Sequence, residues 1–100
     1  MMRGPGVVRL LERALCAAET GIAITRHHAT EWHSATFSGM RHEISGEAAT
    51  SAALDRWLEG LAEAELPVAG HLVADIAVAE VSRDPLRTRF RLEALTVVES

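Results

Sequence analysis

The spacing of the apolar residues constrains the fold most strongly, because it changes twice along the chain from a helical period to a period of two. In the first segment, apolar residues recur at steps of three and four, with Arg9, Glu12 and Arg13 between them. This pattern predicts an amphipathic helix over residues 6–19, ended by Gly21, since glycine adopts left-handed dihedrals without strain. Its apolar positions are Val7, Val8, Leu11, Ala14, Leu15 and Ala18.

The helical spacing returns at residues 50–66, where the inner face is formed by Leu54, Trp57, Leu58 and Leu61. Either Thr50 or Ser51 is expected to cap this helix, because a hydroxyl accepts an otherwise unpaired backbone N–H. Pro67 is expected to end it, since the proline ring disfavours helical geometry in the preceding residue.

After each helix, alternating residues predict a pair of antiparallel strands. We expect the first pair at residues 21–28 and 33–44, joined by a loop at residues 29–32, with Gly39 as a bulge that absorbs a slip in the alternation. The second pair is expected to turn at residues 83–85. Its inward positions are Leu72, Ala74, Ile76, Val78, Thr88, Phe90, Leu92 and Ala94.

The order of helices and hairpins predicts an α+β protein with a two-layer αββαββ arrangement, in which a four-stranded antiparallel sheet carries both helices on one face. A chain of 100 residues is expected to form one domain with one core. Its two units, residues 1–45 and 46–100, have the same order of elements, which suggests an internal αββ duplication. The segments LLERALCAAETG and WLEGLAEAELPVAG match too weakly to separate shared descent from shared periodicity. The order of the strands stays open.

Composition narrows the class of protein. The chain has 48% hydrophobic and 24% charged residues and a net charge of −4, as is typical of soluble globular proteins. No apolar run approaches the ~20 residues needed to cross a bilayer, and the single cysteine forms no disulfide within the chain. We therefore expect a cytoplasmic protein with no membrane partner. The sequence contains no Lys, Asn, Gln or Tyr, which excludes Schiff-base lysines and the lysine of a phosphate loop.

The second hairpin defines a sheet face that points away from the helices. With a turn at residues 83–85, Ala77 is expected opposite Arg91, Asp75 opposite Glu93 and Val73 opposite Leu95. This face is too apolar for an ordinary solvated surface, so we predict a homodimer that forms through it. The alternative is that a terminal segment or loop of the same chain covers the face. The expected interface residues are Val73, Asp75, Ala77, Arg89, Arg91, Glu93, Leu95 and Val97.

A histidine-rich stretch, RHHATEWH at residues 26–33, is the candidate metal site. With a loop at residues 29–32, His28 and His33 are directly opposed, with Cβ atoms about 5 Å apart, and Glu31 is a third candidate ligand for a divalent metal. The spacing does not specify four ligands, so a solvated hairpin tip without a cofactor is favoured over the metal site. The roles of the histidines at positions 27, 28 and 33 stay open.

A second candidate site combines His42, His71 and Asp75 at a dimer cleft. The opposition of Asp75 to Glu93 resembles an acid/base pair, although the neighbouring arginines favour a salt-bridge network instead. His71 and Asp75 are separated by about 13 Å along one strand, so a joint site needs a group from another strand or subunit.

A row of arginines in the last strand is the remaining candidate, for nucleic acid: Arg83, Arg87, Arg89 and Arg91. The chain is acidic overall, with few aromatic residues for base stacking, so nucleic acid is disfavoured as a partner. No motif dictates a reaction or a small-molecule ligand. The sequence therefore favours a small homo-oligomeric binding or assembly module of unassigned activity, with a metal-binding protein or small-molecule enzyme as the alternative.

Overall fold

The structure, a computed structural model, describes residues 6–18 and 21–99 of the chain. Its elements follow the predicted order of helix, hairpin, helix and hairpin. The helices are α1 (Val7–Ala18) and α2 (Ala52–Gly60), the latter followed by a 3₁₀ turn (Leu61–Glu63). The strands are β1 (Ala23–His33), β2 (Ser38–Ala49), β3 (His71–Arg83) and β4 (Arg87–Val98).

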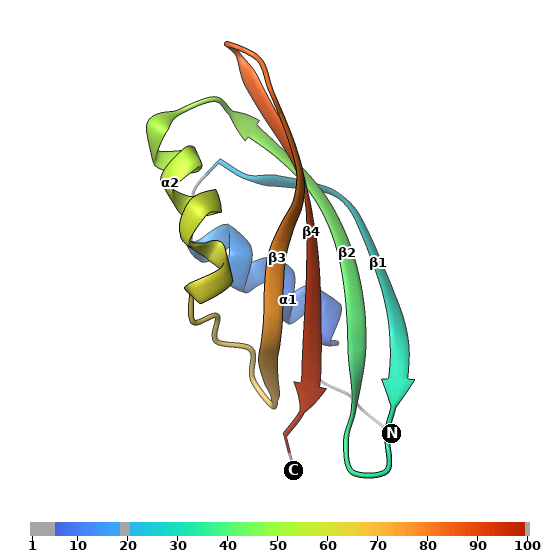
Figure 1. The fold of residues 1–100 in the computed structure, drawn as a ribbon. Coiled ribbons are helices and arrows are strands. Elements are labelled where there is room, and N and C mark those ends of the chain that lie inside the picture. The colour runs from blue at the N-terminus through green and yellow to red at the C-terminus, as the bar shows by residue number, and fades with distance from the viewer. Residues whose placement is uncertain (1–5, 19–20, 100) are drawn as a thin grey trace.

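The four strands form one antiparallel sheet in the order β1-β2-β4-β3. The second strand of each hairpin therefore lies in the centre, and the first strand of each hairpin forms an edge. Both helices pack against the same face of the sheet (Figure 1). This arrangement confirms the predicted α+β class and leaves the opposite face without a covering helix.

Helix α1 begins as predicted, and its predicted last residue, Glu19, lies outside the described residues. Gly21 has a φ of +83°, as expected of a glycine that follows a helix. Cys16 is exposed on this helix. Partial burial of the thiol, together with the negative charge of Glu12, raises the pKa of Cys16, which disfavours a reactive thiolate.

Helix α2 is shorter than predicted. Ser51 caps its start, since the hydroxyl accepts the amide of Leu54 at 3.0 Å. The helix ends at Gly60, where a residue of low helix propensity precedes a single 3₁₀ turn. The prediction that Pro67 ends this helix is therefore wrong.

The first hairpin is longer than predicted, and its turn lies at residues 34–37 rather than at residues 29–32. Ser34 closes this turn, because its amide donates to the carbonyl of Phe37 at 2.8 Å and its hydroxyl accepts from the amide of Phe37 at 3.0 Å. A serine that bonds the backbone three residues ahead is a common way to stabilise a turn.

The irregularity in the first hairpin lies in β1, between Ile24 and Arg26, and not at Gly39. Gly39 stays in regular register because it packs against the backbone of β4, where a Cβ would overlap the carbonyl oxygen of Thr96. The bulge in β1 changes which residues of that strand face the helices. As a result, His27 points toward the helix layer.

The second hairpin turns at residues 84–86, one residue later than predicted. The Asp84 carboxylate accepts the amides of Leu86 and Arg87, each at 2.8 Å. These bonds, that to Arg87 first, hold the pKa of the Asp84 carboxyl below its usual range. The turn therefore fixes a register that differs from the predicted one along the whole hairpin.

Strand β3 also contains two bulges, which the alternation did not reveal: one between Val73 and Asp75, and one between Val78 and Glu80. Asp75 faces Leu95 across the strands, so its predicted opposition to Glu93 is wrong. The first bulge turns Val73 toward the helices, where it packs against the core.

The core lies between the helices and β2, β3 and β4. Its fully buried aliphatic side chains are Leu11, Leu15, Ile44, Leu54, Leu61 and Leu92. Phe90 packs edge to face against Trp57, and Gly46 leaves space for the Phe90 ring. Within residues 6–18 and 21–99, neither helix has the length and apolar character needed to cross a membrane.

Candidate functional site

Four polar side chains form a continuous series of hydrogen-bond contacts from α1 to the buried side of the sheet. Glu12 of α1 lies with Oε2 at 2.7 Å from Nδ1 of His27 on β1, and Nε2 of His27 lies 2.8 Å from Nδ1 of His42 on β2. The Nε2 atom of His42 lies 2.9 Å from Oγ1 of Thr96 on β4. We refer to these four residues as the histidine chain. It connects α1 to three strands of the sheet.

The histidine chain becomes more buried from the helix toward the sheet. The side chain of Glu12 is 32% exposed and that of His27 is 4% exposed, whereas His42 and Thr96 have no exposed surface. Burial lowers the pKa of His42 to about 4, with further lowering by the positive charges of His27 and His71. His42 is therefore neutral near pH 7.

This burial decides what the histidine chain can do chemically. A catalytic imidazole needs access to a reacting atom, but the side chain of His27 is almost fully buried and His42 has no exposed surface. Both ring nitrogens of each histidine already have a partner within hydrogen-bond distance. The arrangement is thus a satisfied polar network that attaches α1 to the sheet, and not an open acid/base site.

The sequence reasoning missed this network because it placed the bulge of the first hairpin at Gly39. With the bulge in β1, His27 and His42 fall at inward positions of adjacent strands. The network has a recognisable pattern once the register is known. Two histidines lie at inward positions of neighbouring strands, below a helix with one acidic residue near its inner face.

The face of the sheet that lies opposite the helices, which we call the uncovered face, draws alternate residues from all four strands. They are Leu72, Asp75, Ala77, Glu80 and Ser82 of β3; Arg89, Arg91, Glu93, Leu95 and Val97 of β4; Arg41, Glu43, Ser45 and Glu47 of β2; and Arg26, His28, Thr30 and Trp32 of β1. Of the eight predicted interface residues, seven lie on this face. Val73 does not, because the bulge after it directs its side chain to the helices, and Leu72 takes its place.

One end of the uncovered face is apolar. Leu72 pairs with Val97, Val97 pairs with Gly39 and Gly39 pairs with Trp32, so a row across all four strands contains no charge. Leu72 is 56% exposed. Leu95 lies in the next row. An apolar row of this kind on a solvated sheet is typical of a surface that binds another molecule.

The remainder of the uncovered face carries charges of both signs. Arg91 contacts Glu93 at 3.0 Å and Glu80 at 3.6 Å, while Arg87 at the start of β4 contacts Glu47 at 2.6 Å. Two arginines of the predicted basic row, Arg87 and Arg91, are thus paired with carboxylates of the sheet, and a third, Arg83, contacts Asp55 of α2 at 2.6 Å.

Other charges on the uncovered face have no such neighbour. Among the residues that the structure describes, no ion pair involves Arg41, Arg89, Glu43 or Asp75. Three of these four residues, Arg41, Glu43 and Asp75, line a depression of about 230 Å³ together with Glu93 and Leu95. Arg26 on the same face is in no ion pair either, so the described part of the uncovered face holds three arginines and two carboxylates without an ion-pair partner.

The predicted metal-site residues do not converge. His28 faces Glu43 and His33 faces Ser38, so the predicted opposition of His28 and His33 is wrong. Glu31 and His33 lie 3.6 Å apart near the tip, and His28 points to the other side of the sheet. Within the described part of the chain, no group of three His, Cys, Asp or Glu side chains is arranged to hold a metal ion.

The second predicted combination is also divided between the two faces. His42 and His71 lie on the helix side, whereas Asp75 lies on the uncovered face. The Nδ1 atom of His71 lies 3.0 Å from the carbonyl of Ala69, which orients the ring at the start of β3. Asp75 and Glu93 do line the same depression, although they are not directly opposed.

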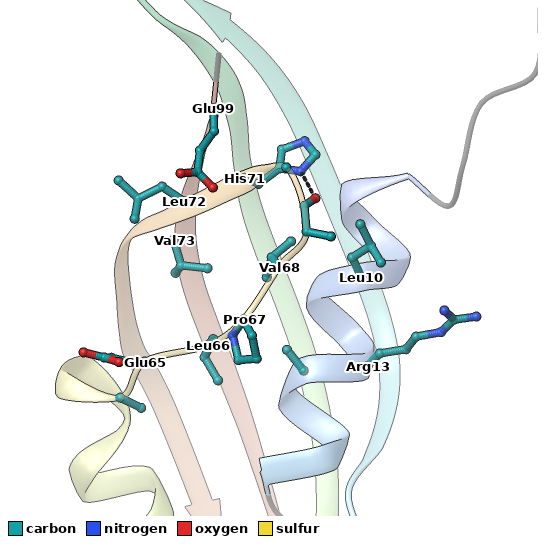
Figure 2. A pocket seen from close by; sticks show the side chains of 14 residues that line it. Leu10, Arg13, Glu65, Leu66, Pro67, Val68, His71, Leu72, Val73 and Glu99 are labelled. Carbon is teal, nitrogen blue, oxygen red and sulfur yellow. Dashed lines mark hydrogen bonds between the residues drawn. The ribbon is translucent and has the colours of Figure 1, made fainter.

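A larger cleft lies on the helix side, between α1 and the segment that leads from the 3₁₀ turn into β3 (Figure 2). Its volume is about 1030 Å³. Leu10, Leu66, Val68 and Val73 give it aliphatic walls, and Figure 2 shows the guanidinium of Arg13 directed away from it. Glu65, His71 and Glu99 also line the cleft, and the ring of His71 already contacts the carbonyl of Ala69 at 3.0 Å.

Comparison with known proteins assigns no family to this chain. Comparison with protein-family models, with curated proteins and with solved structures found no significant match.

Proposed function

We propose that the protein is an assembly module that binds a second copy of itself through the uncovered face. The observation that supports this function is the combination, on one solvated sheet face, of an apolar row with unpaired charges of both signs. A two-fold interface presents the same surface from both copies, so such a surface must complement itself. A face with only one sign of free charge would repel its copy.

The apolar row supplies the driving force in this proposal. Burial of Leu72, Leu95 and Val97 removes apolar surface from water, at about 25 cal/mol per Å² before the costs of association. The free charges supply specificity: Arg41 and Arg89 of one copy meet Glu43 and Asp75 of the other. Complementary charge of this kind raises the association rate and fixes the orientation of the partners.

Replacement of Leu95 with aspartate tests the proposal. The substitution places a charge in the apolar part of the uncovered face, beside Asp75, and we expect it to raise the dimer dissociation constant about 100-fold, which corresponds to roughly 3 kcal/mol. Sedimentation velocity over a range of concentrations measures this constant. Leu86→Asp is the matched control, because Leu86 is 83% exposed at a hairpin tip, and its dissociation constant should equal that of the wild type.

A charge reversal provides a second test that spares the apolar packing. Arg89→Glu should weaken association, since it leaves the uncovered face with an excess of negative charge, whereas Arg9→Glu on the exposed side of α1 should not. Equal association of Leu95→Asp, Arg89→Glu and the wild type would contradict the proposal. Circular dichroism establishes that each variant is folded.

A further inference from the structure

We propose that the histidine chain is a binding site for a single proton, and that uptake of this proton reverses the direction of the hydrogen bonds beyond His27. The geometry leads to this inference because each contact in the histidine chain needs one hydrogen, and, with Glu12 ionised, two arrangements of hydrogens satisfy all the contacts. They differ by one proton.

In the first arrangement both imidazoles are neutral. His27 donates Nδ1–H to the Glu12 carboxylate at 2.7 Å, and His42 donates Nδ1–H to Nε2 of His27 at 2.8 Å. The hydroxyl of Thr96 donates to Nε2 of His42 at 2.9 Å. The two imidazoles then hold two ring protons, and every bond points toward Glu12.

In the second arrangement the chain has gained one proton from solvent. His27 holds protons on both nitrogens and donates Nε2–H to Nδ1 of His42, which has moved its own proton to Nε2 and donates it to Thr96. Thr96 in turn donates to the carbonyl of Met40 at 3.5 Å. The imidazoles now hold three ring protons, the added charge lies beside the Glu12 carboxylate, and His42 remains neutral.

The surroundings limit the chain to one added proton. His42 faces His27 on β1 and His71 on β3, and both oppose a positive charge on a ring that has no exposed surface. Two cationic rings would also place an N–H of His27 against an N–H of His42 at 2.8 Å. On the α1 side, His27 faces the carboxylate of Glu12, which also lies close to Cys16. The one charge that the network accepts is therefore held next to the helix, where it strengthens the attachment of α1 to β1.

Two-bond ¹H–¹⁵N correlation spectra of protein labelled with ¹⁵N-histidine test this inference directly, because they distinguish the tautomers of each ring. At pH 8.5 we expect both His27 and His42 as Nδ1–H tautomers. As the pH falls to 4.5, His27 should become doubly protonated while His42 changes to the Nε2–H tautomer without gaining charge, and the two changes should share one midpoint. A His42 ring that keeps one tautomer throughout, or that gains a second proton together with His27, would overturn the inference.

Glu12→Gln provides the matched test of the charge at the outer end. Glutamine accepts the same hydrogen bond from His27 but carries no charge, so the shared midpoint should move to lower pH by about one unit. Glu31→Gln, the same change at an exposed position of β1, should leave the midpoint unchanged. Equal midpoints in the Glu12→Gln and Glu31→Gln proteins would contradict the proposed location of the proton. Glu12 is half-buried and Glu31 is exposed, and glutamine has nearly the same size and shape as glutamate; circular dichroism establishes that both variants are folded.

Discussion

Replacement of His42 with leucine should lower the free energy of unfolding by about 3 kcal/mol, although leucine fills much of the same space. Leucine provides neither a donor nor an acceptor, so Nε2 of His27 loses its partner inside the protein, and the hydroxyl of Thr96 keeps only the 3.5 Å contact with the carbonyl of Met40. A buried polar group that loses its partner costs about 1–3 kcal/mol, and the substitution leaves one such group without a partner and a second with only a long contact. Urea denaturation near pH 7 measures the loss.

His28→Leu is the control for this prediction. His28 is one residue from His27 but lies on the uncovered face, where it is exposed to solvent. Its replacement should change the free energy of unfolding by less than about 0.5 kcal/mol. If the His42→Leu and His28→Leu proteins were equally stable, the histidine chain would have no part in holding the fold together.

Low pH should destabilise the protein because His42 resists protonation in the folded state. The pKa of His42 is about 4 in the folded protein and 6.5 when the ring is exposed on unfolding, so the unfolded chain binds more protons between these values. The contribution of His42 to the free energy of unfolding is therefore fully present above pH 6.5. It declines as the pH falls and is lost near pH 4. At about 1.4 kcal/mol for each pKa unit, the loss amounts to about 3 kcal/mol.

His42→Gln isolates this effect from the titration of other groups. Glutamine retains a donor and an acceptor for His27 and Thr96 but takes up no proton. The difference in free energy of unfolding between the wild type and the glutamine variant should therefore narrow by about 3 kcal/mol between pH 7 and pH 4. Parallel curves for the two proteins across this range would show that His42 does not resist protonation in the folded state.

The elements of the fold were predictable because their signals are redundant. Several apolar residues mark each helix, and the change to a period of two marks each strand. The side of the sheet on which each residue lies was less predictable. A single extra residue in a strand moves every side chain beyond it to the opposite face. The bulge before Asp75 directed Val73 toward the helices, where it packs against the core, and the bulge before Arg26 brought His27 under α1.

For the candidate site, too, the predictability of a residue depended on the register of its strand. Five of the seven predicted interface residues on the uncovered face belong to β4, which is regular from Arg87 to Val98 and keeps one alternation, and the other two, Asp75 and Ala77, lie in β3 between its two bulges. The histidine chain was missed because its four members lie on four different elements, and only the bulge in β1 aligns them. Sequence spacing does not reveal contacts between segments whose register it does not determine.

The most direct test of self-association through the uncovered face is an isotope-filtered nuclear Overhauser experiment on a mixture of labelled and unlabelled protein, which detects only contacts between copies. The account predicts intermolecular signals from the methyl groups of Leu72, Leu95 and Val97, and none from Leu11 or Leu15 in the core. A spectrum without intermolecular signals at millimolar concentration, or with signals only from residues outside the uncovered face, would contradict it.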